Sequence, residues 1–134
     1  MSGLVLKLAP SERLLINGAV IENGQRRGRL NILTPGARIL RLRDAIHPDE
    51  ATTPVRRLCY QVQLVLSGDR QIDDVTPDLV AGISELSCVF TDPEQHHALS
   101  QARQAATEGQ AYQALKALRS LLQIEDALLM RSNA

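Results

Sequence analysis

Hydrophobic and polar positions alternate along the first 43 residues, whereas from about residue 54 onward the hydrophobic positions recur at helical spacing. Leu4, Leu6 and Leu8 alternate with Val5 and Lys7, which is the pattern of a strand with one buried face. The same reasoning predicts further short strands at 13–16, 30–33 and 39–43.

Two Asn-Gly pairs lie in the middle of this first region, at Asn17-Gly18 and Asn23-Gly24. Asn-Gly is a strong signal for a two-residue hairpin turn, because both residues tolerate the positive φ that the turn needs. Only residues 19–22 separate the two pairs, so the segment predicts three short antiparallel strands in sequence. We therefore expect residues 1–43 to form a small antiparallel β unit of about five short strands.

The rest of the chain predicts helices. Residues 44–53 are polar and contain a proline, and they form the expected connection between the two parts. Thr53-Pro54, Thr76-Pro77 and Asp92-Pro93 are typical helix starts, with a capping side chain followed by proline. Residues 54–134 are thus expected to form about four helices that pack on or beside the β unit. The predicted fold class is α+β.

The last predicted helix runs from about Gln110 to Met130 and ends the helical unit. Its apolar stripe is wider than a single neighbouring helix would cover. Such a stripe is typical either of the hub of a helical unit or of a surface for a partner or a second copy. The candidate residues for that surface are Leu115, Leu118, Leu122 and Leu129.

Charge is distributed unevenly along a chain whose formal net charge is zero. Residues 1–60 hold ten Lys or Arg against five Asp or Glu, a balance of +5, and residues 61–134 hold five against ten, a balance of −5. A basic half indicates a face for a polyanion, although the two halves could also attract each other within or between subunits.

Strand parity predicts where the arginines of the basic half point. If Leu30 and Ile32 face the core, Arg27, Arg29 and Asn31 face solvent. If Leu40 and Leu42 face the core, Arg41 and Arg43 face solvent. The outward residues of the two strands would share one surface if the strands paired through the turn at 34–37. Exposed arginines on a sheet can equally serve solubility and edge protection. Arg56 and Arg57, in the first turn of a helix, could extend the basic surface or pair with Asp49 and Glu50.

No combination of residues predicts catalysis or metal binding. Cys59 and Cys88 have no spacing that would complete a metal site and are expected to be buried free thiols. His96 and His97 are adjacent, so they cannot face one metal from the same helix. The 44% hydrophobic fraction is ordinary for a folded protein, and neither a signal peptide nor a membrane-spanning run is visible. We expect a soluble, cytoplasmic non-enzyme without cofactors.

The run ERLLINGAVIENG followed by RRGRL, together with TPVRRLCYQVQLVL further on, resembles the FlbT family of flagellin-biosynthesis repressors. The resemblance covers most of the chain. It implies post-transcriptional regulation, in which the protein acts on the leader of flagellin messenger RNA and shortens the lifetime of the message. Within the family this amounts to repression of flagellum biogenesis through mRNA stability or translation.

Two classes of function follow from the sequence and the resemblance together. The first is an RNA-binding regulator whose partner is the flagellin mRNA leader. Its candidate contacts are the guanidiniums of Arg26, Arg27, Arg29, Arg41 and Arg43 for phosphate and the amides of Asn17, Asn23 and Asn31 for base edges. The second is a protein-interaction module or chaperone-like partner of flagellin or another flagellar regulator, using the terminal helix. A homo-oligomer is compatible with either class.

Overall fold

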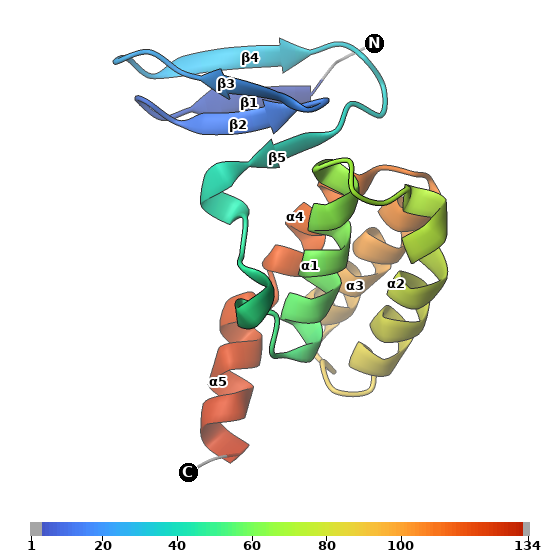
Figure 1. Ribbon diagram of the computed structural model, residues 1–134. Coiled ribbons are helices and arrows are strands. Elements are labelled where there is room, and N and C mark those ends of the chain that lie inside the picture. Colours follow the sequence, from blue (N-terminus) through green and yellow to red (C-terminus); the bar gives the residue numbers. More distant parts are fainter. Residues whose placement is uncertain (1–3, 133–134) are drawn as a thin grey trace.

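The computed structural model describes residues 4–132 and has an α+β architecture, as the sequence predicts. Five strands and two short 3-10 helices come first, and five α-helices follow (Figure 1). The strands and 3-10 helices are β1 (Leu4–Leu8), β2 (Arg13–Ile16), β3 (Ala19–Glu22), β4 (Gly28–Ile32), β5 (Ile39–Arg41), η1 (Leu42–Asp44) and η2 (Pro48–Glu50). The α-helices are α1 (Pro54–Leu66), α2 (Ile72–Leu86), α3 (Pro93–Thr107), α4 (Ala111–Arg119) and α5 (Leu122–Ser132).

The strands form two antiparallel sheets rather than one. The first sheet pairs β1 with β4, and the second has the strand order β3-β2-β5. The β2–β3 hairpin turns at Asn17-Gly18, where φ is +50° and +87°, as the Asn-Gly signal predicts. The Asn17 amide oxygen also accepts a hydrogen bond from the Arg38 backbone N–H at 2.9 Å, which ties the hairpin to the start of β5.

The second Asn-Gly pair does not make a hairpin, and this part of the sequence prediction is wrong. β4 leaves the second sheet after β3 and pairs with β1 instead. Neither Asn23 nor Gly24 has a positive φ. The Asn23 amide nitrogen donates to the carbonyls of Ala9 at 2.8 Å and Arg26 at 2.9 Å, so its side chain holds a crossover between the two sheets.

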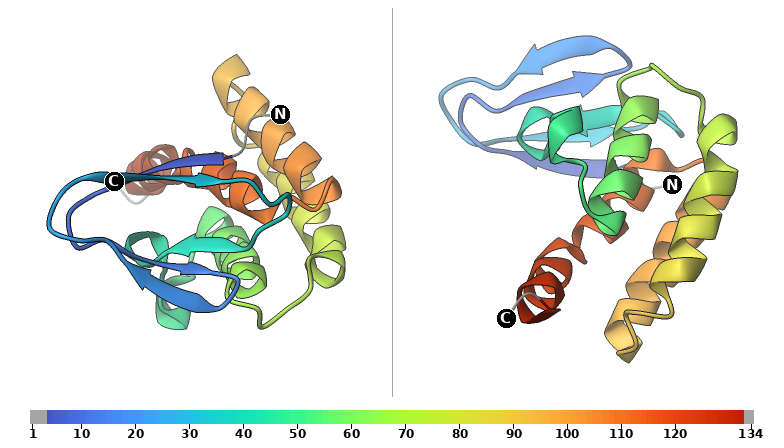
Figure 2. Two further views of the ribbon diagram at one scale, coloured as in Figure 1. Left: turned by 90° about the horizontal axis from the view of Figure 1, so that it is seen from above. Right: turned by 60° about the horizontal axis from the view of Figure 1, so that its bottom comes forward.

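The two sheets enclose a small hydrophobic core of their own, and the second sheet also contacts the helices. Leu14, Ile16 and Ile39 point toward the β1–β4 sheet, where they meet Leu6 and Leu8. On the opposite face, Leu15 and Leu40 pack against the helical core. β5 is therefore buried on both faces, and it lies between the other strands and the helices (Figures 1 and 2).

The starts of α1 and α3 follow the sequence prediction, but that of α2 does not. Thr53 caps α1 and Asp92 caps α3, each with proline in the first turn. α2 begins at Ile72, four residues before Thr76, and includes Pro77 in its second turn. Thr76 donates its hydroxyl to the Ile72 carbonyl at 2.7 Å inside the helix instead of capping it. The acidic pair Asp73 and Asp74 lies in the first turn of α2, where the helix dipole favours negative charge.

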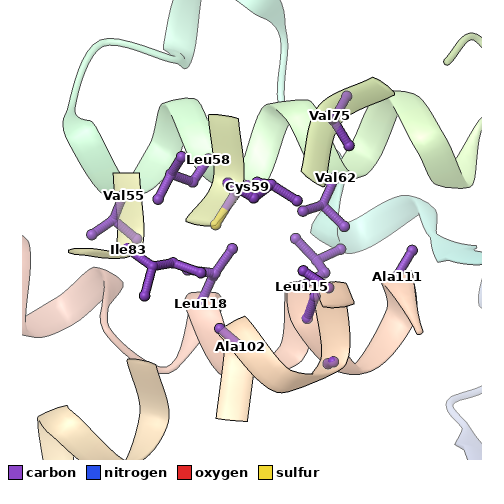
Figure 3. Packing of buried hydrophobic residues seen from close by; sticks show 14 of the residues in the cluster. Val55, Leu58, Cys59, Val62, Val75, Ile83, Ala102, Ala111, Leu115 and Leu118 are labelled. Atoms are coloured by element: carbon purple, nitrogen blue, oxygen red, sulfur yellow. The ribbon is translucent and has the colours of Figure 1, made fainter. Parts of the chain in front are cut away.

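Helices α1 to α4 pack around one core of Leu, Val, Ile and Ala side chains, with Phe90 as its single buried aromatic residue. Val55, Leu58 and Val62 of α1 lie opposite Leu115 and Leu118 of α4 (Figure 3). Cys59 is buried in this core, and burial raises the pKa of its thiol to about 12, so the thiol stays protonated at neutral pH. Cys88 is exposed, contrary to the expectation that both thiols are buried.

The last predicted helix is two helices, α4 and α5, separated at Ser120 and Leu121. Leu115, Leu118 and Leu121 are buried in the core, whereas Leu122 is partly buried and Leu129 is 38% exposed. The stripe therefore serves as a hub along α4 and becomes progressively exposed along α5. In Figure 1, α5 extends away from the other helices toward the C-terminus.

Polar contacts hold the start of α5 against the start of α1. Glu125 is only 4% exposed, and its carboxylate accepts hydrogen bonds from the Thr53 hydroxyl and, at 2.8 Å, from the Val55 backbone N–H. Arg56 makes two hydrogen bonds to the Asp126 carboxylate, at 2.7 and 3.0 Å. Arg56 thus pairs with α5, which is neither of the two roles expected from sequence, and Arg57 donates to the Thr52 carbonyl.

We expect Glu125→Ala to lower the free energy of unfolding by about 2 kcal/mol, because it leaves the buried Val55 N–H and the Thr53 hydroxyl without their acceptor. Urea unfolding followed by circular dichroism measures the change. Gln123→Ala, an exposed change on the same helix, is the matched control. Equal effects of the two substitutions would show that the Glu125 contacts do not stabilise the fold.

The Arg56–Asp126 pair predicts a pH dependence. The hydrogen bonds from Arg56 hold the pKa of Asp126 below its usual range. A carboxyl with a lowered pKa in the folded state stabilises the fold at pH values above its unfolded pKa of about 3.9, and this stabilisation is lost as the pH falls through the folded pKa. Asp126→Asn should therefore destabilise the protein at pH 7, and the difference from wild type should shrink as the pH falls below about 4. A constant difference in urea midpoint from pH 7 to acid would contradict this.

Candidate nucleic-acid interface

The face of the β1–β4 sheet that points away from the core carries cations and no acidic side chain. Leu4, Leu6 and Leu8 of β1 and Leu30 and Ile32 of β4 pack inward. The alternate residues Val5, Lys7, Arg29 and Asn31 point outward and are exposed. Parity thus predicts the orientation of Arg29 and Asn31 correctly.

Two more guanidiniums lie next to this surface in sequence, in the crossover before β4. Arg26 and Arg27 are exposed and directly precede Gly28, the first residue of β4. From Asn23 to Arg43, both included, the sequence contains six arginines and no Asp or Glu. Among the described residues, no carboxylate lies within 4.0 Å of the side chains of Lys7, Arg26, Arg27 or Arg29. We call the exposed set Val5, Lys7, Arg26, Arg27, Arg29 and Asn31 the basic outer face.

Two cations of the basic outer face lie directly opposite each other. Lys7 pairs with Arg29 across the β1–β4 ladder, and both side chains leave the same side of the sheet. Like charges in this position destabilise an antiparallel pair by a few tenths of a kcal/mol to about 1 kcal/mol. Lys7 was absent from the sequence-based site, because its proximity to Arg29 depends on the pairing of β1 with β4.

Arg41 does not face solvent, so that expectation is wrong. It is 7% exposed, and its guanidinium donates to the Lys7 carbonyl at 3.0 Å and lies 3.4 Å from the Glu12 carboxylate. The prediction assumed a longer strand, but β5 ends at Arg41 and the chain turns into η1. Leu42, expected in the core, is consequently exposed, and the interior of the β unit receives Arg41 instead.

The other residues of the predicted RNA site either lie away from the basic outer face or already make hydrogen bonds within the protein. Arg43 is exposed but lies 3.7 Å from Glu12 and 3.9 Å from Asp44, and β5 belongs to a different sheet from β4. The two sets of arginines therefore do not share one sheet surface. The amides of Asn17 and Asn23 are used in hydrogen bonds to the backbone. Of the three asparagines in the predicted site, Asn31 alone has no side-chain hydrogen bond within the described part of the chain.

Residues that could suggest other chemistry are scattered. His96 is hydrogen-bonded to the Ser87 carbonyl at 3.1 Å, and His97 is exposed. Within residues 4–132, no group of three or more His, Cys, Asp or Glu is placed to hold a metal ion. None of the helices described over this range is long and apolar enough to cross a membrane.

A basic, aromatic-free sheet face on a small α+β protein is a surface suited to a polyanion. Comparison with known proteins identifies the family: the profile described as "Flagellar protein FlbT" matches residues 4–129. The chain belongs to the FlbT family. No solved structure gives a significant match.

Relatives from several bacteria match almost the whole chain. The protein named "Probable flagellum biosynthesis repressor protein FlbT" from Caulobacter sp. strain K31 is 32% identical over 94% of this chain and 95% of its own length. The "Flagellum biosynthesis repressor protein FlbT" of Caulobacter vibrioides strain ATCC 19089 is 30% identical over 94% of this chain and 89% of its own length. A relative from Mesorhizobium japonicum is 34% identical over 91% and 82% of the two chains. These names describe a repressor and not an enzyme.

The opposed cations predict that Arg29→Glu will stabilise the fold. The substitution replaces a repulsive Lys7 contact with an attractive one, which should raise the free energy of unfolding by about 0.5 kcal/mol. Urea unfolding measures the change, with Arg29→Gln as the control that removes repulsion without adding attraction. If Arg29→Glu were less stable than Arg29→Gln, Lys7 and Arg29 would not interact in the way the register indicates.

Proposed function

We propose that this protein regulates flagellum biosynthesis as a repressor and that it does so by binding the leader of flagellin messenger RNA through the basic outer face. Binding there promotes decay of the message or blocks its translation. The regulatory role draws on the names of the relatives. Flagellin messenger RNA as the target is what the family resemblance implies, and the surface chemistry described above supports binding of a polyanion.

The observation that supports RNA binding most strongly is the cluster of cations without internal partners. Arg13, Arg41 and Arg56 elsewhere in the chain each have a carboxylate within 4.0 Å. The four cations of the basic outer face have none among residues 4–132, and two of them repel each other. Phosphate groups of a nucleic acid would neutralise this charge, and counterion release would add to the affinity.

The kind of contact follows from the side chains that this face offers. It carries no aromatic residue, so it lacks the stacking platform of common single-strand binding modules. Guanidiniums supply hydrogen bonds to phosphate and planar surfaces for bases, and the free amide of Asn31 supplies donors and an acceptor for a base edge. Most affinity would thus come from phosphate contacts and only a small part from sequence readout.

A second candidate function uses α5 as a surface for flagellin, another flagellar regulator or a second copy of the chain. The specific observation in its favour is apolar exposure near the C-terminus: Met130 is 75% exposed, and Val89 in the turn before α3 is 59% exposed. Pockets beside these residues lie between α5 and the start of α3. RNA binding and protein binding could occur together, because α5 and the basic outer face lie at opposite ends of the molecule (Figure 1).

The test compares two triple variants that remove equal charge. Arg26, Arg27 and Arg29 are replaced by alanine in one, and Arg70, Arg103 and Arg131, three exposed arginines without a carboxylate partner among the described residues, in the other. The first variant should lose affinity for a flagellin leader RNA and lower the salt slope by about 0.7 per lost contact, or about 2 in total. Both should keep the wild-type stability within about 0.5 kcal/mol per site.

Three results would contradict the proposal. Equal losses in the two variants would mean that overall charge, and not the basic outer face, determines binding. An unchanged salt slope in the folded first variant would move the RNA site elsewhere. Binding of purified flagellin but of no RNA by the wild type would favour the α5 function instead. A leader RNA of scrambled sequence is the control for specificity. If the arginines contact phosphate only, the first triple variant should lose the same affinity for the leader and for the scrambled RNA, whereas sequence readout would give a larger loss for the leader.

A further inference from the structure

A second cationic site lies on the other side of β1, between that strand, the turn from β5 into η1, and α4. It is a pocket of about 270 Å³. Four cationic side chains line it from three elements: Arg41 ends β5, Arg43 lies in η1, and Lys116 and Arg119 belong to α4. This volume is near the lower end of the range for small-molecule sites.

The charge in this pocket is only partly neutralised by the protein. Asp44 is the one carboxylate among the lining residues, and it lies 3.4 Å from Arg119 and 3.9 Å from Arg43. Glu12, which is not a lining residue, lies 3.4 Å from Arg41 and 3.7 Å from Arg43. Two carboxylates therefore face four cations, and Lys116 has no carboxylate within 4.0 Å in the described range.

Arg41 provides a second, independent indication of a ligand. Its side chain is 8% exposed, and its Nε–H is buried without a hydrogen-bond acceptor among residues 4–132. Buried donors are nearly always paired, and an unpaired one lowers stability. Glu12 Oε2, 3.4 Å from Arg41 Nη1, is likewise buried without a hydrogen-bond donor in the described range, so Glu12 does not saturate this guanidinium, and an anionic oxygen at the pocket wall would add an acceptor for it.

The pocket also has an aromatic wall. Tyr112, Lys116 and Arg119 are spaced at i, i+4 and i+7 on α4, which puts the ring and two cations on one side of the helix. The half-buried Tyr112 ring packs against the cores of both units, and Leu4 and Leu115 continue the apolar lining. A flat, apolar ring can pack there while charged oxygens reach the cations.

We propose that this pocket binds a nucleoside monophosphate, with the phosphate held by Arg41, Arg43, Lys116 and Arg119 and the base packed against Tyr112. The nucleotide can be free or can be one residue of an RNA chain. Val5 lines the pocket and also belongs to the basic outer face, so the two sites adjoin each other at β1. The RNA source rests on the proposed function, whereas binding of a free nucleotide does not.

The experiment is a titration of the isotopically labelled, full-length protein, followed by amide chemical shifts. Adenosine 5′-monophosphate, adenosine and inorganic phosphate are added separately at constant ionic strength. The nucleotide should bind more tightly than either fragment and shift the amides of residues 112–119 and 4–6. Lys116→Ala should weaken nucleotide binding by about tenfold, and Arg70→Ala, an exposed arginine outside the pocket, should leave it unchanged.

Equal effects of Lys116→Ala and Arg70→Ala would overturn the proposal, because nucleotide binding would then depend on the overall charge of the protein and not on this pocket. The absence of saturable shifts in the wild type at millimolar nucleotide would also overturn it. Displacement of the nucleotide by a short single-stranded RNA assigns the pocket to RNA, and RNA binding without displacement assigns it to a free nucleotide. If the protein binds no RNA but still binds the nucleotide in a Lys116-dependent manner, the proposed function fails and the pocket stands.

Discussion

The burial of β5 on both faces is the constraint on which the rest of the fold depends. Leu40 joins the helical core, Ile39 joins the core between the sheets, and Arg41 reaches across to the β1 backbone. A strand of three residues thus joins the β unit to the helical unit. Each unit alone has too little apolar surface to form a large core. Because Arg41 must enter the interior, Glu12 is required beside it, since a buried guanidinium without a counter-charge would strongly destabilise the fold.

Local chemistry predicted those elements whose geometry is decided within a few residues. Asn17-Gly18 makes its turn, and Thr53-Pro54 and Asp92-Pro93 start helices, because each pair satisfies its own backbone requirements. The same kind of signal failed at Asn23-Gly24, where distant carbonyls take the asparagine amide, and at Thr76-Pro77, where packing of Val75 extends the helix toward its N-terminus. At both places tertiary contacts outweigh the local conformational preference, and such contacts cannot be predicted from a short stretch of sequence.

The same distinction between local and tertiary determinants applies to the candidate site. Period-two alternation was enough to place Arg29 and Asn31 on an exposed face, because the core side of β4 is fixed by Leu30 and Ile32. It could not reveal Lys7, which depends on strand pairing, or the burial of Arg41, which depends on where β5 ends. The division of the terminal helix could not be predicted either, since Glu125 of α5 accepts a hydrogen bond from the Val55 N–H at the start of α1, 70 residues away in sequence.

The zero net charge conceals how the carboxylates of the basic half are used. Glu22 pairs with Arg13, Glu12 with Arg41, and Asp44 with Arg119, so each is already engaged at short range. The remaining acidic residues lie mainly on the helices, and exposed charges beyond about 8 Å are largely screened at physiological salt. The basic outer face therefore keeps its local positive potential although the chain as a whole is neutral, and a polyanion that approaches this face encounters that potential and not the average.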